Sequence, residues 1–121
     1  MLFIEYPKCS TSNKAKKWLN DNEVVYGIRN IKEDNPSFEE LKKWHSDSGL
    51  ELKRFFNTSG RLYREQGIKD IIKVESNDKL LRILSTDGMM VKRPILIGDD
   101  FILVGFKEDE WNKTILNKKD L

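Results

Sequence analysis

The single cysteine of the chain, Cys9, is the residue with the clearest chemical potential. The apolar stretch 2–6 predicts a strand, Pro7 marks a turn, and a helical pattern begins at or just after Cys9. The thiol is therefore expected at a helix N-terminus, where unpaired backbone N–H groups and the helix dipole favour the thiolate. A thiol in such a place has a pKa of about 3.5–7.5 instead of about 8.5. The same amides can hold an oxyanion.

Composition narrows the class of protein. The chain has 121 residues, which fits one domain with a modest core. Lys and Arg number 22 against 20 Asp and Glu, a balance that argues against the strongly basic face of a nucleic-acid-binding protein. No apolar run approaches the length of about 18 residues that spans a bilayer, and no signal-peptide pattern is present. We therefore expect a cytoplasmic protein with no direct nucleic-acid partner and no membrane partner.

The numbers of cysteines and histidines argue against an internal disulfide and against a metal site. With one cysteine an internal disulfide is impossible, so any disulfide must form with another molecule. The one histidine, His45, has no second ligand at metal-binding spacing, so no metal site is predicted. No bound cofactor is predicted either.

Hydrophobic periodicity predicts the elements that position Cys9. The strand at 2–6 is followed by a helix at 10–22, whose apolar positions 15, 18 and 19 define one buried face. A second strand is predicted at 24–31. Three alternate residues are expected on one side of this strand: Val24, Tyr26 and Ile28. The helix also carries three lysines that we interpret as a solvated face: Lys14, Lys16 and Lys17.

A block of helices is predicted between about 37 and 88. Ser37 and Glu40 form a capping box that opens the first of these helices, and Gly49 is suited to end it. Shorter helices are expected at 50–56 and 61–66, joined by a turn at 57–60. Ser76 is expected to cap a last helix of the block.

The final third of the chain predicts a hairpin and a closing helix. The strands at 95–97 and 101–104 flank a turn at 98–100, and the helix follows at 107–117. The whole order is βαβ, helical block, ββα. We predict an α/β chain with a thioredoxin-like, four-stranded mixed sheet, a single domain over 1–121 and a helical insertion at about 37–88. In the fold that this order resembles, the active cysteine follows the first strand and a proline before the third strand faces it. Pro94 has that place, so the resemblance implies that it faces Cys9 through a cis Arg93–Pro94 bond.

Four segments carry a resemblance to a known family. They are Tyr6-Pro-Lys-Cys-Ser-Thr-Ser-Asn-Lys-Ala-Lys-Lys-Trp-Leu19, Leu52-Lys-Arg-Phe-Phe-Asn-Thr-Ser-Gly60 with Tyr63-Arg64, Asp87-Gly-Met-Met-Val-Lys-Arg-Pro94, and Val104-Gly-Phe-Lys-Glu-Asp-Glu-Trp111. Through them nearly the whole chain resembles the arsenate-reductase-like group of thioredoxin-fold proteins, of ArsC, Spx and YffB type. The match is best to an uncharacterised branch that carries the Phe-Phe-Asn-Thr-Ser-Gly segment.

The resemblance assigns roles to individual positions. Cys9 matches the nucleophilic cysteine, and Arg93 matches the arginine that contacts the oxyanion before the cis proline, Pro94. Ser10, Thr11 and Ser12 match the loop whose amides surround that anion. Asn57 is assigned to the anion site from its place in the family motif, although its segment is also typical of a helix-linking turn.

Several positions depart from the family pattern. The histidine expected four residues before the cysteine is Glu5. Arginines expected around the oxyanion are replaced by three uncharged residues: Asn13, Asn57 and Phe106. Because charge-assisted arginine contacts are the strong ones for such an anion, this loss argues against arsenate as the substrate.

Ser12 stands where many relatives have a second cysteine, so an internal thiol switch is excluded. A serine hydroxyl can still hydrogen-bond the Cys9 thiolate. The resemblance thus implies a catalytic set of Cys9, Ser12 and Arg93 in a monothiol oxidoreductase, with glutathione or glutaredoxin as the external reductant. The alternative is a Spx-like transcription adaptor that binds the RNA polymerase α subunit without a redox switch.

Overall fold

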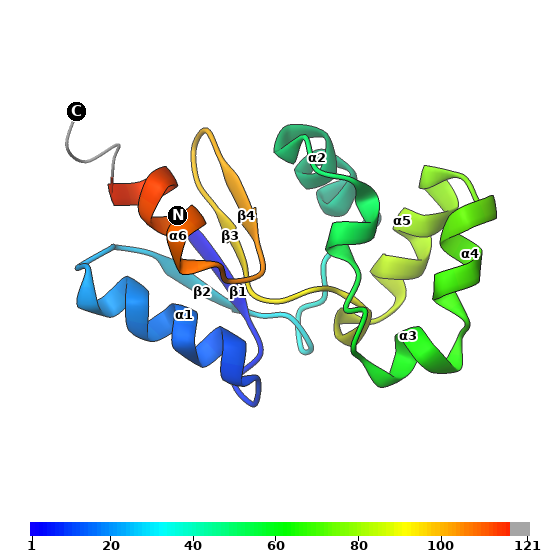
Figure 1. Ribbon diagram of the computed structural model, residues 1–121, viewed down its shortest axis with the longest axis horizontal. Helices are drawn as coiled ribbons and strands as arrows, with labels where there is room; N and C mark the ends of the chain where they lie inside the picture. Colours follow the sequence, from blue (N-terminus) through cyan, green and yellow to red (C-terminus); the bar gives the residue numbers. More distant parts are fainter. Residues whose placement is uncertain (117–121) are drawn as a thin grey trace. The chain divides into compact units, whose positions relative to one another are not determined.

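The computed structural model describes residues 1–116 and divides them into two units (Figure 1). The first unit contains Met1–Arg29 and the chain from Arg93 onward, and the second contains Asn30–Lys92. All helices of the predicted insertion lie in the second unit. No helix within residues 1–116 is long and apolar enough to cross a membrane.

A mixed four-stranded sheet forms the framework of the first unit, which confirms the predicted thioredoxin-like α/β fold. Its strands are β1 (Leu2–Glu5), β2 (Gly27–Asn30), β3 (Ile95–Ile97) and β4 (Ile102–Val104), in the spatial order β2-β1-β3-β4. The central pair β1–β3 is antiparallel, with Phe3 opposite Leu96. β3 and β4 form the predicted hairpin, closed by a 2.9 Å bond from the Gly98 N–H to the Phe101 carbonyl.

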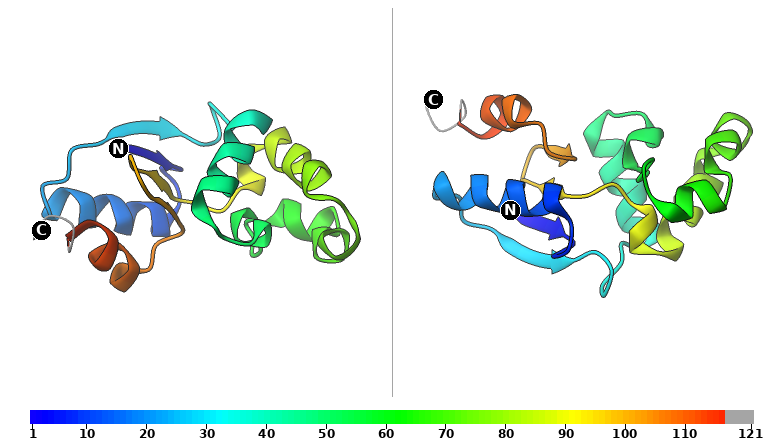
Figure 2. Two further views of the ribbon diagram at one scale, coloured as in Figure 1. Left: turned by 90° about the horizontal axis from the view of Figure 1, so that it is seen from above. Right: turned by 60° about the horizontal axis from the view of Figure 1, so that its bottom comes forward.

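Helix α1 (Ser10–Asp21) lies beside the strands (Figure 2) and buries the predicted face. The core contains Ala15, Trp18 and Leu19 of this helix together with residues of three strands and of the last helix, namely Phe3, Leu96, Leu103 and Trp111. Trp18 and Trp111 meet edge to face at 5.7 Å, an arrangement that aromatic rings favour. This packing fixes α1, and with it the start of α1, against the sheet.

The closing helix is shorter and less regular than predicted. α6 spans Glu108–Trp111 and continues as the π-helical segment Asn112–Leu116. The Asn112 side chain accepts a 3.1 Å hydrogen bond from the Trp18 ring N–H, which ties this segment to α1. The predicted last residue, Asn117, lies outside the described residues.

β2 is shorter than predicted, because only Gly27–Asn30 of the predicted strand 24–31 pairs with the sheet. Pairing with the sheet begins only at Gly27, whose N–H donates to the Met1 carbonyl at 2.9 Å. Val24 is buried, whereas Ile28 is 56% exposed on this edge strand. The predicted grouping of Val24, Tyr26 and Ile28 on one side of a strand fails because Val24 and Tyr26 lie before β2 begins.

In the second unit, α2 (Phe38–Ser48) begins and ends as predicted. The Ser37 hydroxyl accepts the Glu40 N–H and the Glu40 carboxylate accepts the Ser37 N–H, both at 3.1 Å. Gly49 takes the left-handed conformation with φ 68° that glycine tolerates best. The remaining elements are η1 (Leu52–Phe55), α3 (Arg61–Glu65), α4 (Ile68–Val74), α5 (Asn77–Thr86, capped by Ser76) and η2 (Gly88–Met90).

Candidate active site

The thiol of Cys9 lies at the junction between β1 and α1, as predicted. Cys9 is the N-cap of the twelve-residue helix, with extended backbone angles of φ −95° and ψ 121°. Its N–H donates to the Tyr6 carbonyl at 2.9 Å, and its carbonyl accepts the Asn13 N–H at 3.1 Å. The Asn13 side chain also donates to the Pro7 carbonyl at 3.1 Å. Asn13, which stands in place of an arginine, therefore holds the turn that carries Cys9.

Four donors converge on the sulfur of Cys9. They are the backbone N–H of Thr11, the backbone N–H and hydroxyl of Ser12, and the guanidinium of Arg93. Partial burial alone raises the pKa of this thiol, but the hydrogen bonds from Ser12, Thr11 and Arg93 outweigh it, so the pKa of Cys9 is lowered. The site thus favours the thiolate, which is the nucleophilic form.

Ser12 links the sheet to the sulfur. It is completely buried, and its hydroxyl oxygen accepts the Tyr6 N–H at 3.4 Å while hydrogen-bonding the sulfur of Cys9. The structure therefore supports the predicted contact between this hydroxyl and the thiolate. A serine at this position keeps a donor beside the sulfur but offers no second thiol.

Arg93 reaches the same place from the strand next to β1. The Arg93–Pro94 bond is cis, as predicted, and Pro94 is buried directly before β3. The guanidinium lies over the Tyr6 ring at 5.2 Å from its centroid and hydrogen-bonds the sulfur. Two of its nitrogens, Nε and Nη1, are buried without a hydrogen-bond partner within residues 1–116. Such donors are rare in folded proteins and call for an acceptor.

The buried carboxylate of Glu5 pairs with the partly exposed Lys16, an ion pair that the sequence interpretation missed. Glu5 ends β1 and is 3% exposed, and its Oε1 lies 2.7 Å from the Lys16 Nζ on α1. Lys16 is therefore not part of a wholly solvated face, contrary to the prediction. The signal in the sequence was a charged residue at the end of an apolar strand, with a lysine next to the buried Ala15 on the following helix.

The structure brings some predicted site residues together and separates others by unit. Cys9, Thr11, Ser12 and Arg93 meet at the sulfur in the first unit. Pro94 belongs to the same unit and follows Arg93 through the cis bond, and its facing Cys9 stays a prediction. Ser10 is the exposed first residue of α1, and its contribution to an anion site stays a prediction.

Asn57 belongs to the second unit and is engaged in its own turn. Its N–H donates to the Met90 carbonyl at 2.8 Å, its side-chain amide approaches the Met89 carbonyl at 3.5 Å, and its side-chain oxygen accepts the Ser59 hydroxyl at 3.4 Å. A Cβ on Gly60 would come within 2.5 Å of the Asn57 side-chain nitrogen, so glycine suits this tight turn. The assignment of Asn57 to an anion site stays a prediction.

Phe106 replaces a cation with an aromatic ring. It is half-buried and packs edge to face on Trp111 at 4.9 Å in the core of the first unit. This position therefore contributes to packing, and it supplies no positive charge to the Cys9 site.

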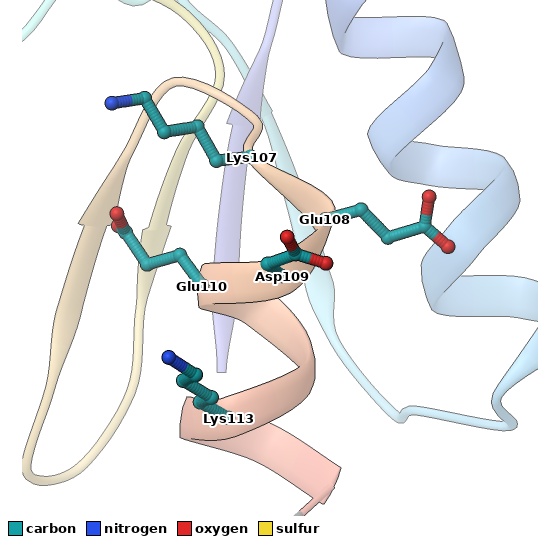
Figure 3. A pocket seen from close by; sticks show the side chains of 5 residues that line it. All are labelled: Lys107, Glu108, Asp109, Glu110 and Lys113. Atoms are coloured by element: carbon teal, nitrogen blue, oxygen red, sulfur yellow. The ribbon is translucent and has the colours of Figure 1, made fainter.

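A surface hollow of about 580 Å³ on α6 contains none of the predicted site residues. It is lined by Lys107, Glu108, Asp109, Glu110 and Lys113 (Figure 3). Lys107 and Glu110 extend to one side of the helix and Glu108 to the other. The charged side chains of this hollow thus point to different sides of α6.

Comparison with known proteins gives a consistent picture. The model of the ArsC family matches residues 4–114. The protein YusI of Bacillus subtilis is 45% identical over 113 residues, which cover 93% of this chain and 96% of YusI. The global transcriptional regulator Spx of Staphylococcus epidermidis is 27% identical over 112 residues, covering 93% of this chain and 84% of that protein.

Solved structures agree in fold over nearly the whole chain. A putative ArsC family related protein from Bacteroides fragilis superposes with a TM-score of 0.90 at 47% identity, covering 93% of this chain and 94% of the other. A possible arsenate reductase from Streptococcus mutans has a TM-score of 0.84 at 40% identity, with 99% and 97% covered.

Proposed function

Because this chain belongs to the ArsC family, we propose that it is a cytoplasmic monothiol oxidoreductase with Cys9 as the nucleophile. Glutathione or a glutaredoxin is its external reductant. The observation that carries the proposal is the pair of buried, unpartnered nitrogens of Arg93, within residues 1–116, beside a sulfur that already receives four donors. This arrangement supplies both a thiolate and unused N–H groups for a bound anion.

The reaction begins with attack by the thiolate on an oxidised centre of the substrate. A bond forms from the Cys9 sulfur to that centre, and the oxygen bound there leaves as water after it takes up protons. Arg93 and the amides of Thr11 and Ser12 hold the negative charge of the reacting group. Their N–H groups are in place before the reaction, so little reorganisation is needed.

Turnover requires two external thiols because the chain has one cysteine. The first attacks the Cys9 sulfur, releases the product reduced by two electrons, and leaves a mixed disulfide on Cys9. The second attacks the outer sulfur of that disulfide, returns the Cys9 thiolate, and leaves as the external disulfide. Ser12 cannot replace either external thiol.

The charge of the site limits the substrate class. Arg93 is the cation in contact with the sulfur, whereas Asn13 bonds the Pro7 carbonyl and Phe106 packs in the core. We therefore propose a reacting group with about one negative charge, since a dianion such as arsenate would call for more charge-assisted contacts.

A second function rests on the similarity to Spx. Here the chain is an adaptor that binds the RNA polymerase α subunit, and Ser12 leaves it without a thiol switch. The Cys9 site would then be a remnant that makes no lasting bond with external thiols.

Mass spectrometry after incubation with oxidised glutathione separates these functions. We expect one glutathione on Cys9, its removal by reduced glutathione or glutaredoxin, and slower formation in Arg93→Met. Arg61→Met is a matched control, because Arg61 is exposed and paired with Glu65 in the second unit. If no adduct forms and the Cys9→Ser variant still retains purified polymerase α subunit, the enzyme proposal is wrong and the adaptor is favoured.

A further inference from the structure

The buried carboxylate of Glu5 has no part in the proposed reaction. It is 3% exposed and pairs with Lys16, whose side chain is 33% exposed, at 2.7 Å. One carboxylate oxygen, Oε2, has no hydrogen-bond partner within residues 1–116. A buried ion pair is costly to form, and a buried charge that loses its partner is costlier still. The position of this pair therefore requires an explanation.

The ion pair lies next to the residues that hold the sulfur. Glu5 directly precedes Tyr6, whose N–H donates to the Ser12 hydroxyl oxygen. Ser12 and Lys16 are four residues apart on α1 and so lie on the same face of that helix. The Glu5–Lys16 pair and the Tyr6–Ser12 hydrogen bond are thus neighbouring ties between the end of β1 and the first turns of α1. The Ser12 hydroxyl, which takes part in the Tyr6–Ser12 hydrogen bond, is also a donor to the sulfur of Cys9.

We propose that Glu5 and Lys16 are a charge-balancing pair for Cys9. The pair lies beside the Tyr6–Ser12 hydrogen bond at the end of β1, next to a donor of the sulfur. Lys16 cancels the negative charge of Glu5 there, so that the charge of Glu5 does not oppose formation of the Cys9 thiolate. This inference rests on the proposed function of Cys9, and it adds two residues that set the thiol without touching the substrate.

Other charged or titratable groups surround the same end of the sheet. Arg93 precedes β3, Tyr6 directly follows β1, Lys8 lies in the turn before Cys9, and Arg29 lies on the neighbouring β2. Arg93 is in contact with the sulfur, and its contribution favours the thiolate whichever residues stand at positions 5 and 16. The effect of the ion pair is therefore the difference between the pKa of Cys9 in a variant and its pKa in the wild-type protein.

Charge balancing predicts opposite changes in the pKa of Cys9 for the two partners, whereas a purely structural role predicts the same change for both. Glu5→Gln keeps the shape of the side chain and removes a negative charge near the thiolate, so the pKa of Cys9 should fall. Lys16 tolerates this change because it is partly exposed and can be solvated. Lys16→Met leaves the Glu5 carboxylate uncompensated, so the pKa of Cys9 should rise. A purely structural role would displace the Thr11 and Ser12 donors from the sulfur in both variants, and the pKa of Cys9 would rise in both.

The experiment measures the rate of iodoacetamide alkylation of Cys9 in the full chain against pH. For a unit charge within about 10 Å we expect shifts of about half a pKa unit to one unit. At acidic pH this corresponds to about three- to tenfold faster alkylation in Glu5→Gln and a similar slowing in Lys16→Met. The double variant should return close to wild type. Lys17→Met is the control, since Lys17 is an exposed lysine paired with Asp21.

Two outcomes overturn the proposal: a higher pKa in both single variants, or no change in Glu5→Gln. If Lys16→Met fails to fold, as circular dichroism would show, Glu5→Gln and the double variant still decide. Alkylation needs neither substrate nor reductant, so failure of the glutathione adduct would count against the proposed function alone. An unchanged Glu5→Gln profile in a protein that still forms the adduct would count against the charge-balancing pair alone.

Discussion

Replacing Arg93 by methionine should raise the pKa of Cys9 without lowering the free energy of unfolding. Within residues 1–116 the structure gives this guanidinium one hydrogen bond to the sulfur, one cation–π contact with Tyr6, and two buried nitrogens without partners. Methionine is similar in length and apolar, so it fills much of the same space without leaving a buried polar group. The substitution therefore removes a functional contact together with an unfavourable buried feature.

The expected magnitudes follow from these contacts. A hydrogen bond to a charged group contributes about 1.5–3 kcal/mol, and 1.36 kcal/mol corresponds to about one pKa unit. Because Cys9 is partly exposed, we take the lower end and expect its pKa to rise by about one unit. Each unpartnered buried donor costs about 1–3 kcal/mol, whereas the cation–π contact with Tyr6 contributes about 0.5–1 kcal/mol. The free energy of unfolding should therefore stay unchanged or increase.

Two assays on one variant test this reasoning. Alkylation against pH gives the pKa of Cys9, and urea unfolding at pH 7 gives the stability. Arg61→Met serves as the control for loss of an exposed arginine. A loss of several kcal/mol with an unchanged pKa would refute the reasoning, because Arg93 would then be a structural residue and its unpartnered nitrogens would carry no functional meaning.

Other contacts lead to three more expected outcomes. Ser12→Cys should form an internal disulfide between Cys9 and the introduced cysteine in place of the glutathione adduct, because the Ser12 hydroxyl already contacts the sulfur; a persistent adduct in the mass spectrum would contradict this. The folded-state pKa of Cys9 lies below its unfolded value, so wild type should gain stability relative to Cys9→Ala as pH rises through the folded pKa, up to about 8.5. Urea unfolding between about pH 5 and 9 checks the sign, and a constant difference would contradict it. Ser37→Ala should lower the unfolding free energy by about 1 kcal/mol, because the Glu40 N–H loses its cap; calorimetry showing no decrease would exclude that role.

Local signals in the sequence explain what can be predicted. The helix start at Cys9 follows from an apolar strand, a proline turn and a helical period close together in the chain. The capping box at Ser37 and the hairpin around Gly98 are also set by residues close in sequence. The cis bond before Pro94 is predicted from its place in the fold, before the third strand.

The features that sequence reasoning misses depend on contacts between elements. The pairing of Glu5 with Lys16 needs the register of α1 over β1, which periodicity alone does not give. The strand predicted at 24–31 begins only at Gly27, because the hydrogen bond from the Gly27 N–H to the Met1 carbonyl sets the point at which β2 joins the sheet. The unpartnered nitrogens of Arg93 can be recognised only once every neighbouring acceptor within residues 1–116 is located.

An activated thiol at Cys9 is the central claim, and its pKa in the wild-type protein is the most direct test. The rate of alkylation of this single cysteine should follow a titration curve with a pKa clearly below about 8.5, because its donors outweigh its burial. A pKa at or above about 8.5 would contradict the claim, since the donors of Thr11, Ser12 and Arg93 would then fail to stabilise the thiolate.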